Sequence, residues 1–266
     1  MSTVEISELL RPGLLQGVSI VLAGTPADAG AGGALGSAVS AACIQLGARV
    51  FECPLDADRL AAGELDSEHA AQQAVDRALA QVGGVHLLVI DGASLFAQVA
   101  ETAPEAGRAA LRACLDASWN VTRVVACRAF LPGESDRTAG ALAADGMGGV
   151  GGAERARATG GRIVYLVPAR DLGASSPAPS PAPSPEGEGE HVEAACAGLE
   201  NLARTLSIEW ARHEVTAVAI APGAVGVAEA EAAAEVAVLT AYLASPAGAY
   251  FSGCLLDLGG RIASQA

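Results

Sequence analysis

A glycine-rich turn behind the first apolar segment is the clearest candidate for ligand chemistry. Five glycines crowd residues 24–36, and Gly24, Gly30 and Gly36 are our candidate contacts. Glycines at a strand-to-helix turn let the backbone approach a dinucleotide pyrophosphate, which the N–H groups at the helix start can bind. The spacing matches no standard fingerprint, so a flexible turn without a ligand is an equally good interpretation.

An acidic side chain after the second strand usually binds the ribose of such a cofactor. The second apolar segment ends at Cys53, so the expected position falls on Pro54 or Leu55. Asp56 is our candidate and Asp58 could also reach the ribose, but each is as readily a turn residue. No arginine is placed to bind a 2′-phosphate, which favours NAD over NADP if either binds.

The composition excludes several other kinds of chemistry. All 16 basic residues are arginine, so neither a Schiff-base lysine nor a Walker-type phosphate loop can form. The six cysteines include no C-x-x-C pair and no histidine lies at zinc-ligand spacing, which predicts reduced thiols and no metal site. A formal net charge of −14 disfavours nucleic acids and anionic membranes as partners. Without a signal peptide or a membrane-length apolar run, we expect a cytoplasmic protein.

Strand-like apolar segments alternate with alanine-rich helical patterns along the chain. The strands are nearly continuous in apolar residues, as expected for a parallel sheet covered on both faces. Their predicted ranges are Val18–Ala23, Arg49–Cys53, His86–Ile90, Arg162–Val167, Thr216–Ala221 and Cys254–Leu258. The predicted helices are Leu35–Leu46, Ser67–Val82, Ala106–Phe130, Val192–His213 and Ala228–Ala244. This alternation predicts a single doubly wound, Rossmann-type α/β domain over residues 1–266.

Two segments do not fit a compact domain and are predicted to be flexible insertions. Gly133–Gly160 is rich in glycine and alanine, and Gly173–Glu190 is a Pro-Ala-Ser repeat that ends in alternating acid and glycine. Such compositions bury too little apolar surface to fold, which favours polyproline-like or disordered chain. A functional loop is the alternative in both cases.

The stretch Cys196–Val225 resembles the active-site helix, sixth strand and Pro-Gly turn of the short-chain dehydrogenase/reductase family, with Pro222-Gly223 as that turn. Ile90-Asp91-Gly92-Ala93 resembles the turn after the family's fourth strand. The resemblance implies strand order 3-2-1-4-5-6-7, with the third strand short or missing because the chain before Glu64 is too short. It also implies a nicotinamide cofactor, NAD or NADP, near Asp91, Gly92, Pro222 and Gly223.

The family's catalytic residues do not carry over to this chain. By resemblance, the general-acid Tyr falls on Val192, and the Lys that lowers its pKa falls on Cys196. The Ser of the fifth strand falls on Pro168, and the Asn of the preceding helix falls on Trp119, or on Asn120 with a one-residue shift. Valine has no proton to donate, and a neutral cysteine cannot make a phenol acidic.

Substitute residues could still support chemistry. His191 adjoins the vacant tyrosine position and could act as an acid, and Cys196 could be a thiolate near a helix start. Five residues along a helix separate them by about 140°, so they do not share a face. Val227 replaces the family's nicotinamide-contacting Thr, and the substrate-covering segment that follows is nearly absent.

Three functions are compatible with this resemblance. The favoured one is a non-catalytic pseudoenzyme that forms a homo-oligomer, or a hetero-oligomer with an intact family member, through Ala106–Phe130 and Val192–His213. It would bind a cofactor weakly or not at all. An atypical NAD(P)-dependent oxidoreductase acting on a carbonyl or hydroxyl group, and a nucleotide or metabolite sensor, are the alternatives.

Deleting Ser176–Gly187 should leave the melting temperature within a few degrees of the wild-type value. The apolar content of this segment cannot offset an ordering cost of about 1–2 kcal/mol per residue. Thermal denaturation of the full-length and shortened chains, followed by circular dichroism, checks this. A large drop in melting temperature, or a loss of solubility, would show that the segment packs against the domain.

Overall fold

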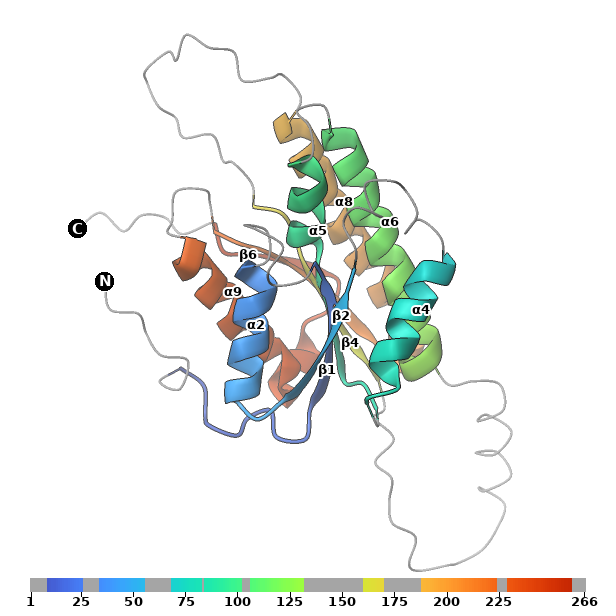
Figure 1. Ribbon diagram of the computed structural model, residues 1–266. Coiled ribbons are helices and arrows are strands. Elements are labelled where there is room, and N and C mark those ends of the chain that lie inside the picture. The colour runs from blue at the N-terminus through green and yellow to red at the C-terminus, as the bar shows by residue number, and fades with distance from the viewer. Residues whose placement is uncertain are drawn as a thin grey trace, which may run out of the picture.

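Six apolar segments pair into one fully parallel sheet (Figure 1). The computed structural model describes residues 9–25, 34–55, 68–82, 84–101, 106–131, 160–169, 188–223 and 229–259. The strands are β1 (Ser19–Gly24), β2 (Arg49–Pro54), β3 (Leu87–Asp91), β4 (Arg162–Leu166), β5 (Thr216–Ala221) and β6 (Cys254–Asp257). Nearly every residue of β1, β3, β4 and β5 is buried, which explains why these segments are continuously apolar.

The strand order is β2-β1-β3-β4-β5-β6, which confirms the predicted doubly wound arrangement. It equals the expected seven-stranded order without its third strand. Among the described residues no strand lies beyond β2, and residues 56–67, where a short third strand would fall, lie outside them. The order reverses between β1 and β3, so the carboxyl ends of these two strands form the switch point at which such sheets bind ligands.

Helices cover both faces of the sheet (Figure 1). Helices α2 (Ala34–Gln45) and α9 (Glu229–Ala244) pack together on one face. The other face carries α4 (Glu68–Leu79), α5 (Gly92–Ala100), α6 (Gly107–Val125) and α8 (Glu188–Glu209). Short turns of π or 3₁₀ helix lie at Ala126–Phe130, Ala211–His213 and Pro246–Tyr250. The predicted helices therefore form within a few residues of the expected bounds.

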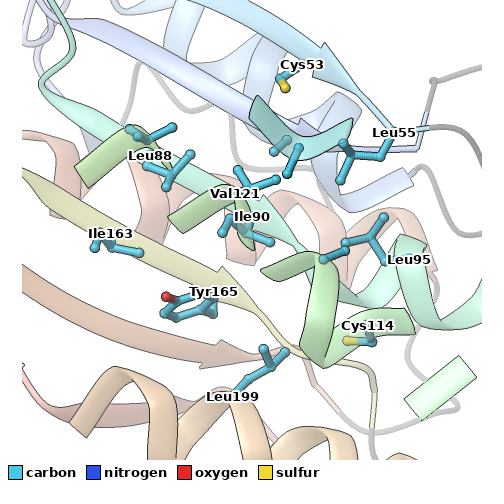
Figure 2. Packing of buried hydrophobic residues seen from close by; sticks show 14 of the residues in the cluster. Cys53, Leu55, Leu88, Ile90, Leu95, Cys114, Val121, Ile163, Tyr165 and Leu199 are labelled. Atoms are coloured by element: carbon cyan, nitrogen blue, oxygen red, sulfur yellow. The ribbon is translucent and has the colours of Figure 1, made fainter. Parts of the chain in front are cut away.

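Two apolar cores hold these layers together. The larger core lies between the sheet and α4, α5, α6 and α8, and it contains Leu88, Ile90, Tyr165 and Leu199 (Figure 2). The smaller core lies on the opposite face and includes Ile20, Leu87, Val39 and Val236. Alternate residues of β1 and β3 enter different cores, as the two-residue period of a strand requires.

At α8 the structure differs from the predicted start of the helix and from the predicted end of the flexible segment before it. This helix begins at Glu188, four residues before the expected start at Val192, so the last three residues of the segment predicted as flexible form its first turn. Residues 132–159 and 170–187, which hold most of both predicted insertions, lie outside the described residues.

Tyr165 is the largest fully buried side chain of the larger core. Its hydroxyl lies 2.8 Å from Oγ1 of Thr122 on α6, which joins the middle of the sheet to that helix. Burial raises the pKa of the phenol, against a smaller lowering by this hydrogen bond. Tyr165 therefore serves as a structural residue and not as a proton donor to a ligand.

Replacing Tyr165 by Phe should lower the free energy of unfolding by about 1–3 kcal/mol, because the Thr122 hydroxyl loses its buried partner. The double variant Tyr165→Phe/Thr122→Val removes both polar groups and should recover much of that loss. Urea denaturation of the two single variants and the double variant measures this coupling. Strictly additive losses would contradict the hydrogen bond.

Candidate functional site

The carboxylate of Asp91 links the starts of two helices at the switch point of the sheet. Asp91 ends β3 and is only 2% exposed. Its Oδ2 accepts a hydrogen bond of 2.9 Å from the backbone N–H of Gly36, in the first turn of α2. Its Oδ1 accepts one of 3.0 Å from the N–H of Ser94, which makes Asp91 the N-cap of α5. Each carboxylate oxygen thus satisfies an N–H group of a different helix.

Asp91 also explains why glycines stand at two of the predicted cofactor positions. A Cβ atom on Gly24 would lie 2.9 Å from Cβ of Asp91, and one on Gly36 would lie 2.8 Å from its Oδ2. Both distances are shorter than real Cβ contacts, so any larger residue would displace the aspartate. The glycines were predicted to admit a pyrophosphate, but within the described chain it is Asp91 that requires them.

Burial raises the pKa of Asp91 to about 6. The hydrogen bonds from Ser94 and Gly36 oppose this rise, because they stabilise the ionised form. The Ser94 hydroxyl donates to the Asp91 carbonyl oxygen at 2.9 Å and accepts from the N–H of Thr25 at 3.3 Å. Above pH 6 the start of α2 therefore already contacts a buried negative charge.

The positions that the family resemblance assigns to catalysis are filled by apolar or buried groups. Cys196 is fully buried on α8, and its Sγ donates to the carbonyl oxygen of Pro168 at 3.2 Å. Pro168, at the serine position, is buried just past the end of β4. Val192, at the tyrosine position, is half-buried in the first turns of α8. Cys196 and Pro168, the positions that the resemblance assigns to a lysine and a serine, therefore contact each other.

A second buried thiol, which the sequence analysis missed, lies at the same edge of the sheet. Cys114 on α6 is fully buried and its Sγ donates to the carbonyl oxygen of Gly92 at 3.3 Å (Figure 2). Burial is the largest cause that raises its pKa, and the neighbouring Cys196 and Asp91 raise it further. The burial of Cys114 and its hydrogen bond to Gly92 both depend on contacts between distant segments, so the local sequence does not predict either of them. The spacing Asp91-x-x-Ser94, by contrast, is a capping pattern that sequence could have revealed.

The two substitute residues do not come together as an acid and a thiolate. His191 is half-buried and lies against the start of α6, where a Cβ atom on Gly107 would be 2.9 Å from its Cδ2. Cys196 instead faces the end of β4.

The remaining candidates fall in different places. Asn120 is buried in α6, whereas Trp119 is 39% exposed. The alignment that is shifted by one residue therefore puts a buried asparagine at the family's asparagine position. Pro222 and Gly223 are buried directly after β5, and a Cβ atom on Gly223 would meet only the Leu258 carbonyl oxygen, at 3.9 Å. Gly30, Asp56 and Val227 lie outside the described residues.

The described residues contain neither a candidate metal centre nor a membrane-spanning helix. Their His, Cys, Asp and Glu side chains include no group of three or more that could hold a metal ion. Among the described helices, none is long and apolar enough to cross a membrane.

A fully parallel sheet of this order, with its glycine turn at the switch point, defines a Rossmann-type protein. No family model and no curated protein matches the chain, but solved structures do. The citronellol catabolism dehydrogenase AtuB of Pseudomonas aeruginosa PAO1 is 26% identical, with 95% of this chain and 98% of that chain covered and a TM-score of 0.59. These likenesses support membership in the short-chain dehydrogenase/reductase family.

Two further structures share this fold at lower identity. A short-chain dehydrogenase from Mycobacterium smegmatis is 21% identical, with 97% of this chain and 99% of that chain covered and a TM-score of 0.59. The 3-ketoacyl-(acyl-carrier-protein) reductase of Brucella melitensis, solved in complex with NADH, is 20% identical, with coverages of 93% and 99% and a TM-score of 0.59. The neighbours are therefore named as oxidoreductases, and one of them holds a nicotinamide cofactor.

The buried Asp91 carboxyl should make the protein less stable as the pH rises from about 4 to about 6. Its folded pKa of about 6 exceeds the ordinary 3.8, so the folded state binds the proton more tightly in that window. Deprotonation therefore lowers the free energy of unfolding by about 3 kcal/mol in total, and this loss is complete once the pH is well above 6.

Urea denaturation of wild type and Asp91→Asn at several pH values isolates this contribution as the difference between the two proteins. The difference should change by about 2 kcal/mol between pH 4 and pH 7. Asp116→Asn, at a half-buried carboxylate on α6, serves as the control and should show little change. A difference that does not vary with pH would contradict the raised pKa.

Proposed function

We propose that this protein is a non-catalytic member of the short-chain dehydrogenase/reductase fold that acts by associating with a second copy of itself or with an intact relative. The observation that carries the proposal is the buried contact between Cys196 Sγ and the Pro168 carbonyl oxygen. The family resemblance assigns these two positions to a lysine and a serine. A neutral buried thiol supplies no positive charge, and proline has no side-chain hydroxyl.

The loss of a general acid weighs most against turnover. A positioned proton donor typically contributes about 10²–10⁴-fold in rate, and Val192 has no proton to give. Tyr165 cannot replace it, because its hydroxyl is buried against Thr122. The chain also has no lysine that could be recruited from elsewhere.

The phosphate half of the cleft also fits a dinucleotide poorly. In Rossmann-type proteins the pyrophosphate lies against the start of the helix that follows the first strand. Here the Gly36 N–H of that helix donates to Asp91, whose carboxylate is negative at pH 7. A phosphate would have to approach a buried like charge, which costs binding free energy. Weak or absent binding is therefore part of the proposal, with NAD favoured over NADP.

Two helices on the same face of the sheet, α6 and α8, support the proposed association between subunits. Trp119 on α6 is 39% exposed and Ile208 on α8 is 78% exposed, and large apolar side chains are costly to leave in water. These are the two helices whose apolar stripes were expected to form a subunit interface. The net charge of −14 favours a complex with neither nucleic acid nor membrane as a partner. We place this complex in the cytoplasm.

An atypical NAD(P)-dependent oxidoreductase is the second candidate, and the solved neighbours favour it because they are named as dehydrogenases and reductases. Its acid would be His191, which is half-buried at the start of α8. A nucleotide or metabolite sensor is the third candidate and would bind in the same cleft without turnover.

The purified protein should not oxidise NAD(P)H or reduce NAD(P)⁺ when offered aldehydes, ketones and secondary alcohols, because no described group can act as the acid at the tyrosine position. Absorbance at the nicotinamide band measures this, and the dehydrogenase AtuB provides the positive control. Saturable cofactor binding without turnover would favour the sensor. Turnover that His191→Ala or Cys196→Ala abolishes would contradict the proposal and establish the oxidoreductase.

A further inference from the structure

Basic side chains gather at the amino edge of the sheet, on the opposite side from the cofactor cleft. Arg49 is the first residue of β2 and Ser19 is the first residue of β1, and the two residues pair across these strands. The N–H of His86 donates to the Ser19 carbonyl oxygen at 2.9 Å, and the N–H of Arg162 donates to the His86 carbonyl oxygen at 3.1 Å. His86 lies just before β3. Arg162 is paired with Leu87, so its side chain leaves the sheet on the opposite face from that of Arg49. Both arginines are nevertheless near enough to His86 for their charges to lower its pKa. We call Arg49, His86 and Arg162 the amino-edge cluster.

Both arginines of the amino-edge cluster are fixed by neutral acceptors. Nη2 of Arg49 donates to the buried Ser19 hydroxyl at 2.9 Å. Nη1 of Arg162 donates to the carbonyl oxygens of Leu243 and Ala244, at 3.0 and 2.7 Å, and to that of Ser245 at the end of α9. Each guanidinium carries five N–H donors, so these bonds hold the side chains in place and leave further donors for a ligand.

Among the residues that the structure describes, neither arginine has a carboxylate partner, although acidic residues outnumber basic ones in the chain, 30 to 16. The ion pairs of the described residues instead join Arg112 to Asp116, Arg128 to Asp76 and Arg204 to Glu200. Glu214 lies beside Gly160, in the turn next to Arg162, but it forms no ion pair with that arginine. Within the described part of the chain, the amino-edge cluster therefore holds two guanidinium groups that form no ion pair, with only the carbonyl oxygens at the end of α9 offsetting the charge of Arg162.

His86 contributes a donor of known direction. Its Nδ1 accepts a hydrogen bond of 3.1 Å from the backbone N–H of Ser19, so a neutral ring carries its proton on Nε2. Burial lowers the pKa of His86, and the positive charges of Arg49 and Arg162 lower it further. The ring is exposed, and its Nε2–H can donate to a ligand from solvent.

We propose that the amino-edge cluster binds a phosphate group, either as free phosphate or as a small phosphate ester. Guanidinium groups bind tetrahedral oxyanions through charge-assisted hydrogen bonds, and an anion at His86 would offset the positive charges of both arginines that act on its ring. The hydrogen bonds that fix Arg49, His86 and Arg162 make the site preorganised. It is separate from the dinucleotide cleft and is independent of whether the protein turns over a cofactor.

The test is a titration of the full chain with sodium phosphate at constant ionic strength, with chloride as the compensating salt, followed by NMR of the histidine ring protons. The His86 signals, assigned by their absence in His86→Gln, should shift and saturate. The pKa of His86 should rise on saturation, because a bound anion stabilises the imidazolium. A parallel titration with glycerol 3-phosphate separates the two sources: tighter binding identifies an ester, and equal affinity identifies free phosphate.

Arg49→Gln should weaken phosphate binding about tenfold, the loss expected for one charge-assisted hydrogen bond. Arg49→Lys keeps the charge and should retain most of the affinity, which covers the case in which the glutamine variant folds poorly. Arg112→Gln, at an exposed arginine on α6, is the matched control and should bind as wild type. No saturation of the His86 signals, or equal weakening by Arg49→Gln and Arg112→Gln, would overturn the proposal.

Discussion

The two hydrogen bonds that Asp91 accepts from Gly36 and Ser94 fix the geometry of the whole switch point. They tie the first turn of α2 and the first turn of α5 to the end of β3 through one carboxylate. A neutral amide at this position would offer only one acceptor oxygen for two N–H groups. The bidentate link therefore depends on an acid, and its burial raises the pKa to about 6.

The fold of this protein and the polar contacts of its candidate site rest on different residues. The sheet order, the helices of both faces and the two cores need only the apolar pattern of the strands and helices. The cleft above them needs particular polar groups, and here Cys196 and Pro168 satisfy each other. A fold can persist while its site changes, because packing and site chemistry rest on different residues.

Sequence alone predicted most of the architecture and little of the site. Continuous apolar strands predicted the parallel sheet, and the family resemblance predicted its strand order, both of which the described residues confirm. The role of Gly36 was not predictable, because its contact with Asp91 joins residues 55 positions apart. The contacts of the buried thiols Cys114 and Cys196 likewise join distant segments. The family resemblance assigned roles to positions 168 and 196, but only the structure placed Cys196 against Pro168.

The central claim is that the charge of Asp91 opposes a dinucleotide at the start of α2. Titrating NADH into the wild type and into Asp91→Asn by calorimetry, at pH 7 and at two ionic strengths, tests it most directly. The account predicts no saturable binding to the wild type and measurable binding to Asp91→Asn, because the variant removes the like charge. Tight binding to the wild type that Asp91→Asn does not improve would contradict it.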